Sequence, residues 1–300
     1  MIRRPPRSTL SSSSAASDVY KRQVTKSLGP FLDTCKFSIS PKSLINDFDA
    51  FSAAFIIILR FEDIDRERCD PKYEKQIEED LSWLNVKWED NPRRQSEHLA
   101  DYSAALKKLE SLNIIYPCFL SRRELNDALS APHNIPTQTN NIMPLNTDQY
   151  LSEAERERRM KKEEPFALRL RMATALKMVG PLYWHDIDKG PQIARPEIFG
   201  DAVIARKDIP TSYHLSVVVD DAIQKVTTVT RGNDLFEATH LHRLLQEILG
   251  LHVPQYKHHK ILTDNKGERM AKRDKSITLQ SLRLSGKKPA DIYKMIGFPR

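Results

Sequence analysis

The chain has 300 residues, of which 40% are hydrophobic and 29% are charged. This length and composition indicate one large or two ordinary folded domains and exclude a disordered chain, and the longest apolar run, which begins at Ala53, is far shorter than the about 18 residues of a membrane span. The net charge of +7 is uneven, because residues 254–300 hold 12 Lys or Arg residues against 4 Asp or Glu residues. A basic end on a more acidic body predicts an anionic partner such as nucleic acid, although basic surface helices are common.

Residues 1–54 show no pattern that predicts a folded element. Residues 1–23 are rich in arginine and serine and resemble translated linker sequence, so we interpret them as a non-native or disordered leader. Residues 24–54 show no clear hydrophobic period and no convincing helix caps, and we leave them unassigned as an aberrant N-terminus.

A strand and several helices follow. The β-branched run FIIILRF at 55–61 predicts a buried strand. Asp70 and Pro71 predict the start of a helix, and a second helix is expected from near Ser96. Capping-box patterns at 121–124 and 152–155 predict two more helices, with a loop-rich insert between them.

The second half of the chain supplies further strand candidates and one helix. Alternation in FALRLRM at 166–172 predicts a half-exposed strand. We expect three more strands in DAVIAR (201–206), YHLSVVVDD (213–221) and KVTTVTRG (225–232), and an amphipathic helix over 236–250 that ends at Gly250. Strands and helices in this order predict an α/β fold that is interrupted by an insertion.

Carboxylates directly after the first predicted strand are candidates for chemistry. Both familiar glycine-rich phosphate cradles are excluded, because no glycine lies between Gly29 and Gly180. RFEDID places Glu62, Asp63 and Asp65 where ligands of α/β sheets bind, so one carboxylate could take an ammonium group or several could hold Mg²⁺. The alternative, which we weigh slightly higher, is that these acids end the strand and cap the next turn.

An arginine and a tyrosine are the other candidates. Arg231 ends a predicted strand, where a guanidinium group can grip a carboxylate through two parallel hydrogen bonds. Tyr213 begins another predicted strand and is equally consistent with a core residue.

Metal binding is not predicted. His240 and His242 are two residues apart on a predicted helix, so their side chains point to different faces. The three cysteines show no pairing pattern, which indicates a reducing compartment, and we expect a cytoplasmic protein.

The segment RMAKR at 269–273 places three cations in five positions, directly after the turn-like DNKG. It is either a solvated basic loop or a mobile clamp for a polyphosphate.

Four segments occur together in an order that carries a resemblance: RFEDID, YHLSVVVDD, TRGNDLFEATHLHRLLQ and RMAKRD. Over residues 55–300 the chain resembles the catalytic domain of the class I glutamyl-tRNA synthetases, and more closely the shortened subfamily of glutamyl-Q tRNA(Asp) synthetases. The resemblance implies a Rossmann-like catalytic domain with an α-rich insertion between its halves and no anticodon-binding domain. The implied regions are 55–115 (first catalytic half), 116–190 (acceptor-binding-like insertion), 191–253 (second catalytic half) and 254–300 (nucleotide loop and helical segment).

The resemblance also implies roles for the candidate residues. Glu62 would receive the amino group of L-glutamate, Arg231 would clamp its side-chain carboxylate, and Tyr213 would line the pocket. The loop of Arg269, Met270, Ala271, Lys272 and Arg273 falls where the family has its second nucleotide motif, with Lys272 as the ATP-contacting catalytic lysine and Ala271 in place of the usual serine. Charge on the phosphates of ATP, which arrives with Mg²⁺, would be stabilised there.

Two departures from the family pattern stand out. The first nucleotide motif, of the His-Ile-Gly-His type, is missing, since residues 24–54 contain no histidine and one glycine. Of the zinc ligands that many members have, Cys118 remains, while Leu120 and Asp148 occupy the places of two others, so zinc is not expected.

The implied activity is ATP-dependent activation of glutamate as glutamyl-adenylate and its transfer to the queuosine base of tRNA(Asp) by a monomer. Two alternatives stay open at this point. One is a truncated glutamyl-tRNA synthetase that charges the tRNA 3′ end, and the other is an inactive tRNA-binding paralogue, which the missing first motif favours.

Overall fold

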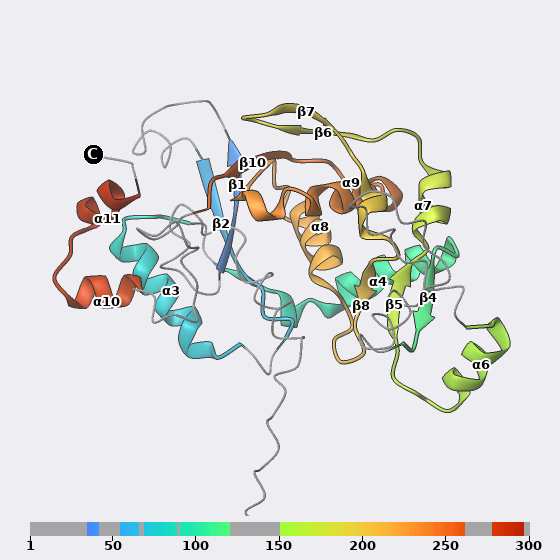
Figure 1. Ribbon diagram of the computed structural model, residues 1–300. Helices are drawn as coiled ribbons and strands as arrows, with labels where there is room; N and C mark the ends of the chain where they lie inside the picture. Colours follow the sequence, from blue (N-terminus) through green and yellow to red (C-terminus); the bar gives the residue numbers. More distant parts are fainter. Residues whose placement is uncertain are drawn as a thin grey trace, which may run out of the picture.

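The computed structural model describes residues 35–41, 55–65, 69–88, 91–120, 151–261 and 278–296. Within these ranges the largest sheet has seven strands, in the order β3-β2-β1-β9-β10-β6-β7 (Figure 1). In this order the strands are β3 (Arg93–Arg94), β2 (Phe55–Phe61), β1 (Cys35–Pro41), β9 (Thr228–Gly232), β10 (Gln255–His259), β6 (Tyr183–Asp186) and β7 (Gly190–Ile193). A smaller antiparallel sheet contains β4 (Ile115–Cys118), β5 (Ala167–Leu170) and β8 (Val203–Ala205).

Helices pack on both sides of the large sheet. The α-helices in the described ranges are α3 (Pro71–Trp83), α4 (Leu99–Ser111), α6 (Glu153–Lys161), α7 (Met172–Met178), α8 (Tyr213–Ile223), α9 (Ala238–Leu249), α10 (Leu279–Leu284) and α11 (Pro289–Met295). Short 3-10 turns lie at η1 (Gln95–Glu97), η3 (Pro196–Phe199) and η4 (Asn233–Leu235). None of the helices in this part of the chain is long and apolar enough to cross a membrane.

The two faces of β2 meet different partners because side chains alternate along a strand. Ile57, Leu59 and Phe61 pack in one apolar cluster with residues of α3, α10 and α11. Ile58 faces the other way, toward a cluster that contains Val229 of β9. Figure 1 shows α3, α10 and α11 on one side of β2, with α8 and α9 on the other. Arg60 and Glu62, in step with Ile58, therefore point toward the side of α8.

Several local predictions are confirmed. The side chain of Asp70 accepts a hydrogen bond from the backbone N–H of Lys72 at 3.0 Å, and Pro71 is the first residue of α3. Ser152 accepts from the N–H of Glu155 at 3.2 Å and so caps α6. Helix α9 ends at Gly250, whose φ of 64° is the left-handed conformation that glycine adopts without strain. The predicted helix start at 121–124 lies outside the described ranges.

The prediction of a strand over 213–221 is wrong, because Tyr213–Ile223 form helix α8. Three consecutive valines favour a strand locally, but Ser212 caps a helix by accepting from the N–H of Leu215 at 3.4 Å. Every residue from Leu215 to Asp221 is buried, so the apolar run covers all sides of a central helix instead of one face of a strand.

Strand β1 was not predicted, since its sequence shows no clear period. Its backbone pairs antiparallel with β2 along its whole length, from Cys35 opposite Phe61 to Pro41 opposite Phe55. It also pairs antiparallel with β9 at Ile39 and Thr228. Because β1 runs opposite to both neighbours, β2 and β9 run parallel to each other.

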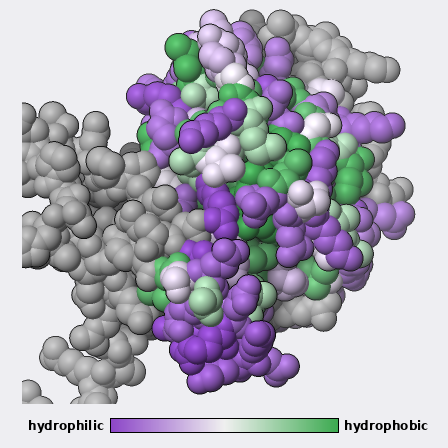
Figure 2. All heavy atoms as spheres, turned by 90° about the vertical axis from the view of Figure 1, so that its right-hand side faces the viewer, coloured by the Kyte–Doolittle hydropathy of each residue, from purple (hydrophilic) through white to green (hydrophobic). Residues whose placement is uncertain are grey.

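Most of the predicted insertion (116–190), with α6, α7 and strands of the small sheet, lies to one side of the large sheet, but its last strand, β6, is part of the large sheet. Figure 2 shows the face on this side, where hydrophilic side chains gather over the lower part of the molecule. No residue of α6 is buried, which fits a charged helix on the surface.

Candidate active site

The carboxyl ends of β2 and β9 meet at one edge of the large sheet. Ile39 of β1 lies opposite Ile57 on one side and Thr228 on the other, so residues three positions further along, Arg60 and Arg231, reach the same level. Ligands of open α/β sheets bind beyond such carboxyl ends. The register alone therefore brings Glu62, which follows β2, to the same edge as Arg231.

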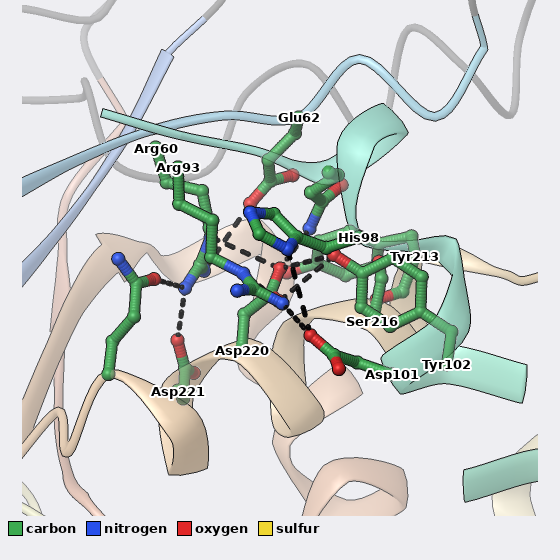
Figure 3. A network of polar contacts seen from close by, with 12 residues as sticks. Arg60, Glu62, Arg93, His98, Asp101, Tyr102, Tyr213, Ser216, Asp220 and Asp221 are labelled. Atoms are coloured by element: carbon green, nitrogen blue, oxygen red, sulfur yellow. Dashed lines mark hydrogen bonds and ion pairs between the residues drawn. The ribbon is translucent and has the colours of Figure 1, made fainter. Parts of the chain in front are cut away.

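Glu62 lies beside a buried arginine at this edge. The Nη2 of Arg60 is 3.5 Å from Oε1 of Glu62, and its Nη1 is 2.9 Å from Oδ1 of Asp221 on α8 (Figure 3). Burial alone would lower the pKa of Arg60, but the charges of Asp221 and Asp220 outweigh burial and raise it. Arg60 thus stays charged and joins the end of β2 to α8.

Asp220 is the centre of the network in Figure 3. Its fully buried carboxylate accepts from the hydroxyl of Tyr102 at 2.9 Å, from Nε2 of Gln95 at 2.7 Å and from Nε of Arg93 at 2.8 Å. Burial, reinforced by the charge of Asp220, raises the pKa of Tyr102 well above its usual range. These bonds fasten β3, η1 and α4 to α8, the helix that also pairs with Arg60 of β2.

Tyr213 connects this network to Arg231. It is the first residue of α8 and 5% exposed, and its ring packs against His242 at a centroid distance of 5.6 Å. The same His242 ring lies 3.1 Å from Nη1 of Arg231, so Tyr213 and Arg231 share this neighbour. Burial raises the pKa of Tyr213, so the phenol stays protonated at neutral pH.

Arg231 is only 2% exposed. Its hydrogen-bond partners include histidine and threonine side chains. Its Nε donates to Nε2 of His258 at 3.1 Å, and its Nη1 lies 3.1 Å from Nδ1 of His242. Its Nη2 donates to the hydroxyl of Thr239, and the guanidinium lies 4.9 Å from the centre of the Tyr256 ring. Among the described residues, none of its hydrogen bonds or ion pairs is with a carboxylate. A buried cation without a direct counter-ion is costly unless an anion joins it.

The structure thus brings Glu62, Tyr213 and Arg231 to one side of the sheet edge. The other two carboxylates after β2 hold the fold instead. Asp63 accepts from the backbone N–H of Ser96 at 2.9 Å and caps η1, while Asp65 lies 3.6 Å from Arg206. The contacts of Asp63 and Asp65 therefore agree with a structural role, which was the alternative to Mg²⁺ binding.

Other predicted site residues lie elsewhere or outside the described ranges. The loop Arg269–Arg273 with Lys272, and also Asp148, fall in ranges that the structure does not describe. Cys118 is buried in β4. His240 contacts Nε1 of Trp184 at 3.2 Å while His242 faces His214, which confirms that the two histidines point to different faces. In the described part of the chain, no group of three or more His, Cys, Asp or Glu side chains could hold a metal ion.

The sequence reasoning missed four residues that shape the site: Arg60, Asp220, Asp186 and His258. The paired acids at the end of VVVDD were visible as a signal, but a strand would have sent them to opposite faces. In helix α8, Asp220 and Asp221 both meet arginines of the sheet edge.

Comparison with known proteins matches residues 52–297 to the class I tRNA synthetases (E and Q), catalytic domain. The Glutamyl-Q tRNA(Asp) synthetase of Rhodobacter capsulatus is 43% identical over 256 residues, which are 80% of this chain and 87% of the relative. The protein of the same name from Nitratidesulfovibrio vulgaris is 36% identical, over 79% of this chain and 73% of the relative. A Glutamate–tRNA ligase of Prochlorococcus marinus is 32% identical, over 76% of this chain and 48% of the relative.

Solved structures agree in fold. The glutamate-tRNA synthetase of Elizabethkingia anophelis superposes with a TM-score of 0.63 at 23% identity, over 79% of this chain. The glutamate tRNA ligase of Elizabethkingia meningosepticum, in complex with its amino acid, gives 0.61 at 24% identity. The chain spans about half the length of these two proteins, at 53% and 52%. The family match over residues 52–297 and the relatives that are more than 30% identical show that the chain belongs to the class I tRNA synthetases of the E and Q type and contains their catalytic domain.

Proposed function

We propose that this protein activates L-glutamate with ATP and transfers it to the queuosine base of tRNA(Asp). The α-carboxylate of glutamate attacks the α-phosphorus of ATP, the bond to the β-phosphate oxygen breaks, and pyrophosphate leaves. A nucleophile of the modified base then attacks the acyl carbon of glutamyl-adenylate, and AMP leaves. The names of the relatives from Rhodobacter capsulatus and Nitratidesulfovibrio vulgaris support this acceptor.

The main observation that supports glutamate as the substrate is that the buried Arg231 lies among neutral hydrogen-bond acceptors. A substrate carboxylate would supply the missing anion and take a bidentate grip from the guanidinium, which an amide side chain could not match. We assign the γ-carboxylate of glutamate to Arg231, the amino group to Glu62, and the pocket wall between them to Tyr213. Their positions on one side of the sheet edge support this assignment.

ATP, with Mg²⁺ as its counter-ion, would take the remaining part of the site. We assign Arg269, Met270, Ala271, Lys272 and Arg273 to the phosphates, with Lys272 stabilising the charge that develops as pyrophosphate leaves. The support here is the match of this loop to the family's second nucleotide motif, within the residues that the family match covers.

Glutamate-dependent exchange of pyrophosphate into ATP, measured without tRNA, tests the activation step. We expect exchange with L-glutamate and none with L-glutamine. Transfer is tested with tRNA(Asp) that carries or lacks queuosine. Product that forms only with the modified tRNA supports the proposed acceptor, while equal product with both tRNAs favours charging at the 3′ end.

An inactive tRNA-binding protein is the second candidate, because residues 24–54 contain no histidine and hence no first nucleotide motif. Binding of glutamate or of tRNA without any pyrophosphate exchange would favour it. If replacing residues 1–54 by a segment with a His-Ile-Gly-His type motif restored exchange, the result would favour the enzyme.

A further inference from the structure

A chain of hydrogen bonds leads from the β6–β7 hairpin to Arg231. Oδ2 of Asp186, the last residue of β6, lies 2.6 Å from Nδ1 of His258 on β10. The other ring nitrogen of His258, Nε2, accepts from Nε of Arg231 at 3.1 Å. The side chains of Asp186 and His258 are both fully buried, so water does not compete for these bonds.

Donor and acceptor chemistry fixes the tautomer of His258. The Nε of an arginine always carries a hydrogen, so the Nε2 that faces it must be an acceptor. The ring proton of His258 is therefore on Nδ1 and is donated to the carboxylate of Asp186. Burial, together with the charge of Arg231, lowers the pKa of His258, which agrees with a neutral ring.

The carboxylate of Asp186 is itself held by backbone. Its Oδ1 accepts from the N–H groups of Asp188 and Lys189 at 3.0 and 2.9 Å, in the turn between β6 and β7. The ring of His258 is flanked by the rings of Trp184 and Phe236, at centroid distances of 5.7 and 5.0 Å. Neither partner can turn away without breaking these contacts.

We propose that Asp186 and His258 are positioning residues that orient Arg231 for the side-chain carboxylate of the substrate; this inference rests on the proposed function. Asp186 holds His258 in the tautomer that accepts from Nε of Arg231. Because the acceptor is a neutral ring and not a carboxylate, the guanidinium is fixed in direction but keeps its charge for the substrate. His242 and Thr239 hold its two terminal nitrogens, each of which carries a second N–H.

The variant Asp186→Asn tests this with almost no change in shape. The asparagine Oδ1 can keep both turn bonds, while its Nδ2 places a donor against Nδ1 of His258. The ring proton must then move to Nε2, where it faces the Nε–H of Arg231. We expect the dissociation constant for L-glutamate, measured by calorimetry on the full chain, to rise roughly tenfold or more, since bonds to charged groups contribute about 1.5–3 kcal/mol.

Asp188→Asn is the matched control. Asp188 lies in the same turn, but its half-exposed carboxylate pairs with Lys257 at 3.3 Å and does not contact His258. We expect it to bind glutamate as the unchanged protein does. Unchanged affinity in Asp186→Asn, with the fold intact by circular dichroism, would overturn the proposal.

His258→Gln separates positioning from mere packing. The glutamine Oε1 can accept from Arg231 whatever the state of Asp186, so this variant should keep most of the affinity, whereas His258→Phe should lose it. When it is added to His258→Gln, Asp186→Asn should cost much less than it does alone. Equal, additive losses with and without His258→Gln would show that Asp186 acts only through stability.

The ligand-free protein gives an independent readout. In ¹⁵N spectra of histidine-labelled protein we expect His258, identified by its loss in His258→Phe, as the neutral Nδ1–H tautomer between pH 6 and pH 8. Asp186→Asn should convert it to the Nε2–H tautomer. An Nε2–H tautomer in the unchanged protein would reject the proposed arrangement, while a correct tautomer without glutamate binding would reject the proposed function alone.

Discussion

Tyr213 and Arg231 contact the same ring, that of His242, which joins the first residue of α8 to the end of β9. The same helix carries Asp221, which pairs with Arg60 of β2 at 2.9 Å. Glu62 and Arg231 thus lie at the same edge of the sheet, near opposite ends of α8.

Replacing Arg231 by methionine should abolish glutamate binding while leaving the fold intact. Methionine fills a similar volume. No described carboxylate pairs with Arg231, so its removal leaves none of those carboxylates without its partner. Calorimetry should show no heat with L-glutamate, and the melting temperature should not fall by more than a few degrees. Arg158→Met is a suitable control, because Arg158 is half exposed on α6 and pairs with Glu155 at 2.6 Å. Glutamate affinity that survives in Arg231→Met would remove Arg231 from the site.

The change Glu62→Gln should weaken binding of glutamate but not that of glutarate, which lacks the amino group. Glutamine keeps the shape of the side chain and removes the charge that would attract an ammonium group. Competition between the two ligands, followed by calorimetry, measures the difference. An equal loss for both ligands would mean that Glu62 acts only through its contact with Arg60.

Lys272→Ala should lower the turnover of adenylate formation far more than it raises the dissociation constant for glutamate. Its ammonium group is assigned to charge that develops in the transition state. Single-turnover adenylation, in a protein that shows pyrophosphate exchange, separates the two quantities. A defect confined to glutamate affinity would contradict this role.

The buried carboxyl group of Asp80 should make the free energy of unfolding depend on pH. It is buried where α3 meets α10, 3.3 Å from Arg283, and burial raises its pKa to about 6. The folded protein therefore binds this proton more tightly than the unfolded chain does, so stability falls as pH rises from about 4 through about 6. Asp80→Asn removes this cost and should raise the free energy of unfolding by about 1–2 kcal/mol at pH 7.5, with no gain at pH 4.

Urea unfolding at both pH values measures the effect. Glu79→Gln is the control, because Glu79 is more exposed and lies at the same 3.3 Å from Arg283. A gain in Asp80→Asn that is equal at pH 4 and pH 7.5 would show that the charge of Asp80 is not its cause.

Asp220→Asn should destabilise the fold by about 3 kcal/mol, because it leaves buried donors around a neutral amide. Asp208→Asn, at a half-exposed ion pair with Arg206, should cost less than about 1 kcal/mol. Denaturant unfolding of both variants checks the ranking. A similar small loss in both would mean that Asp220 is not the structural centre of the network.

Much of the fold could be predicted from local signals. The cap and proline at Asp70 and Pro71, the glycine after α9 and the β-branched run of β2 each have a local physical cause, and the structure has those elements. Helix α8 could not be predicted, because three valines favour a strand and only the surrounding core decides that all sides of this segment are buried. The boundaries of the catalytic halves and the insertion stay predictions.

The candidate site was predictable only in part. Glu62 and Arg231 follow from strand ends and family motifs, whereas Tyr213 follows from a family motif alone. The register of β1 between β2 and β9 brings Glu62 and Arg231 to one edge. Asp186 and His258 lie in an edge hairpin and in the strand beside β9, and no local pattern marks their contact with Arg231. Such residues become visible only when the strand order is known.

Calorimetric titration of the full chain with L-glutamate and with L-glutamine is the most direct test of this account. We predict measurable binding of glutamate, at least tenfold weaker binding of glutamine because its neutral amide cannot replace the carboxylate at Arg231, and loss of the difference in Arg231→Met. Equal binding of the two amino acids, or no binding of either, would contradict the claim that this buried guanidinium selects an acidic side chain.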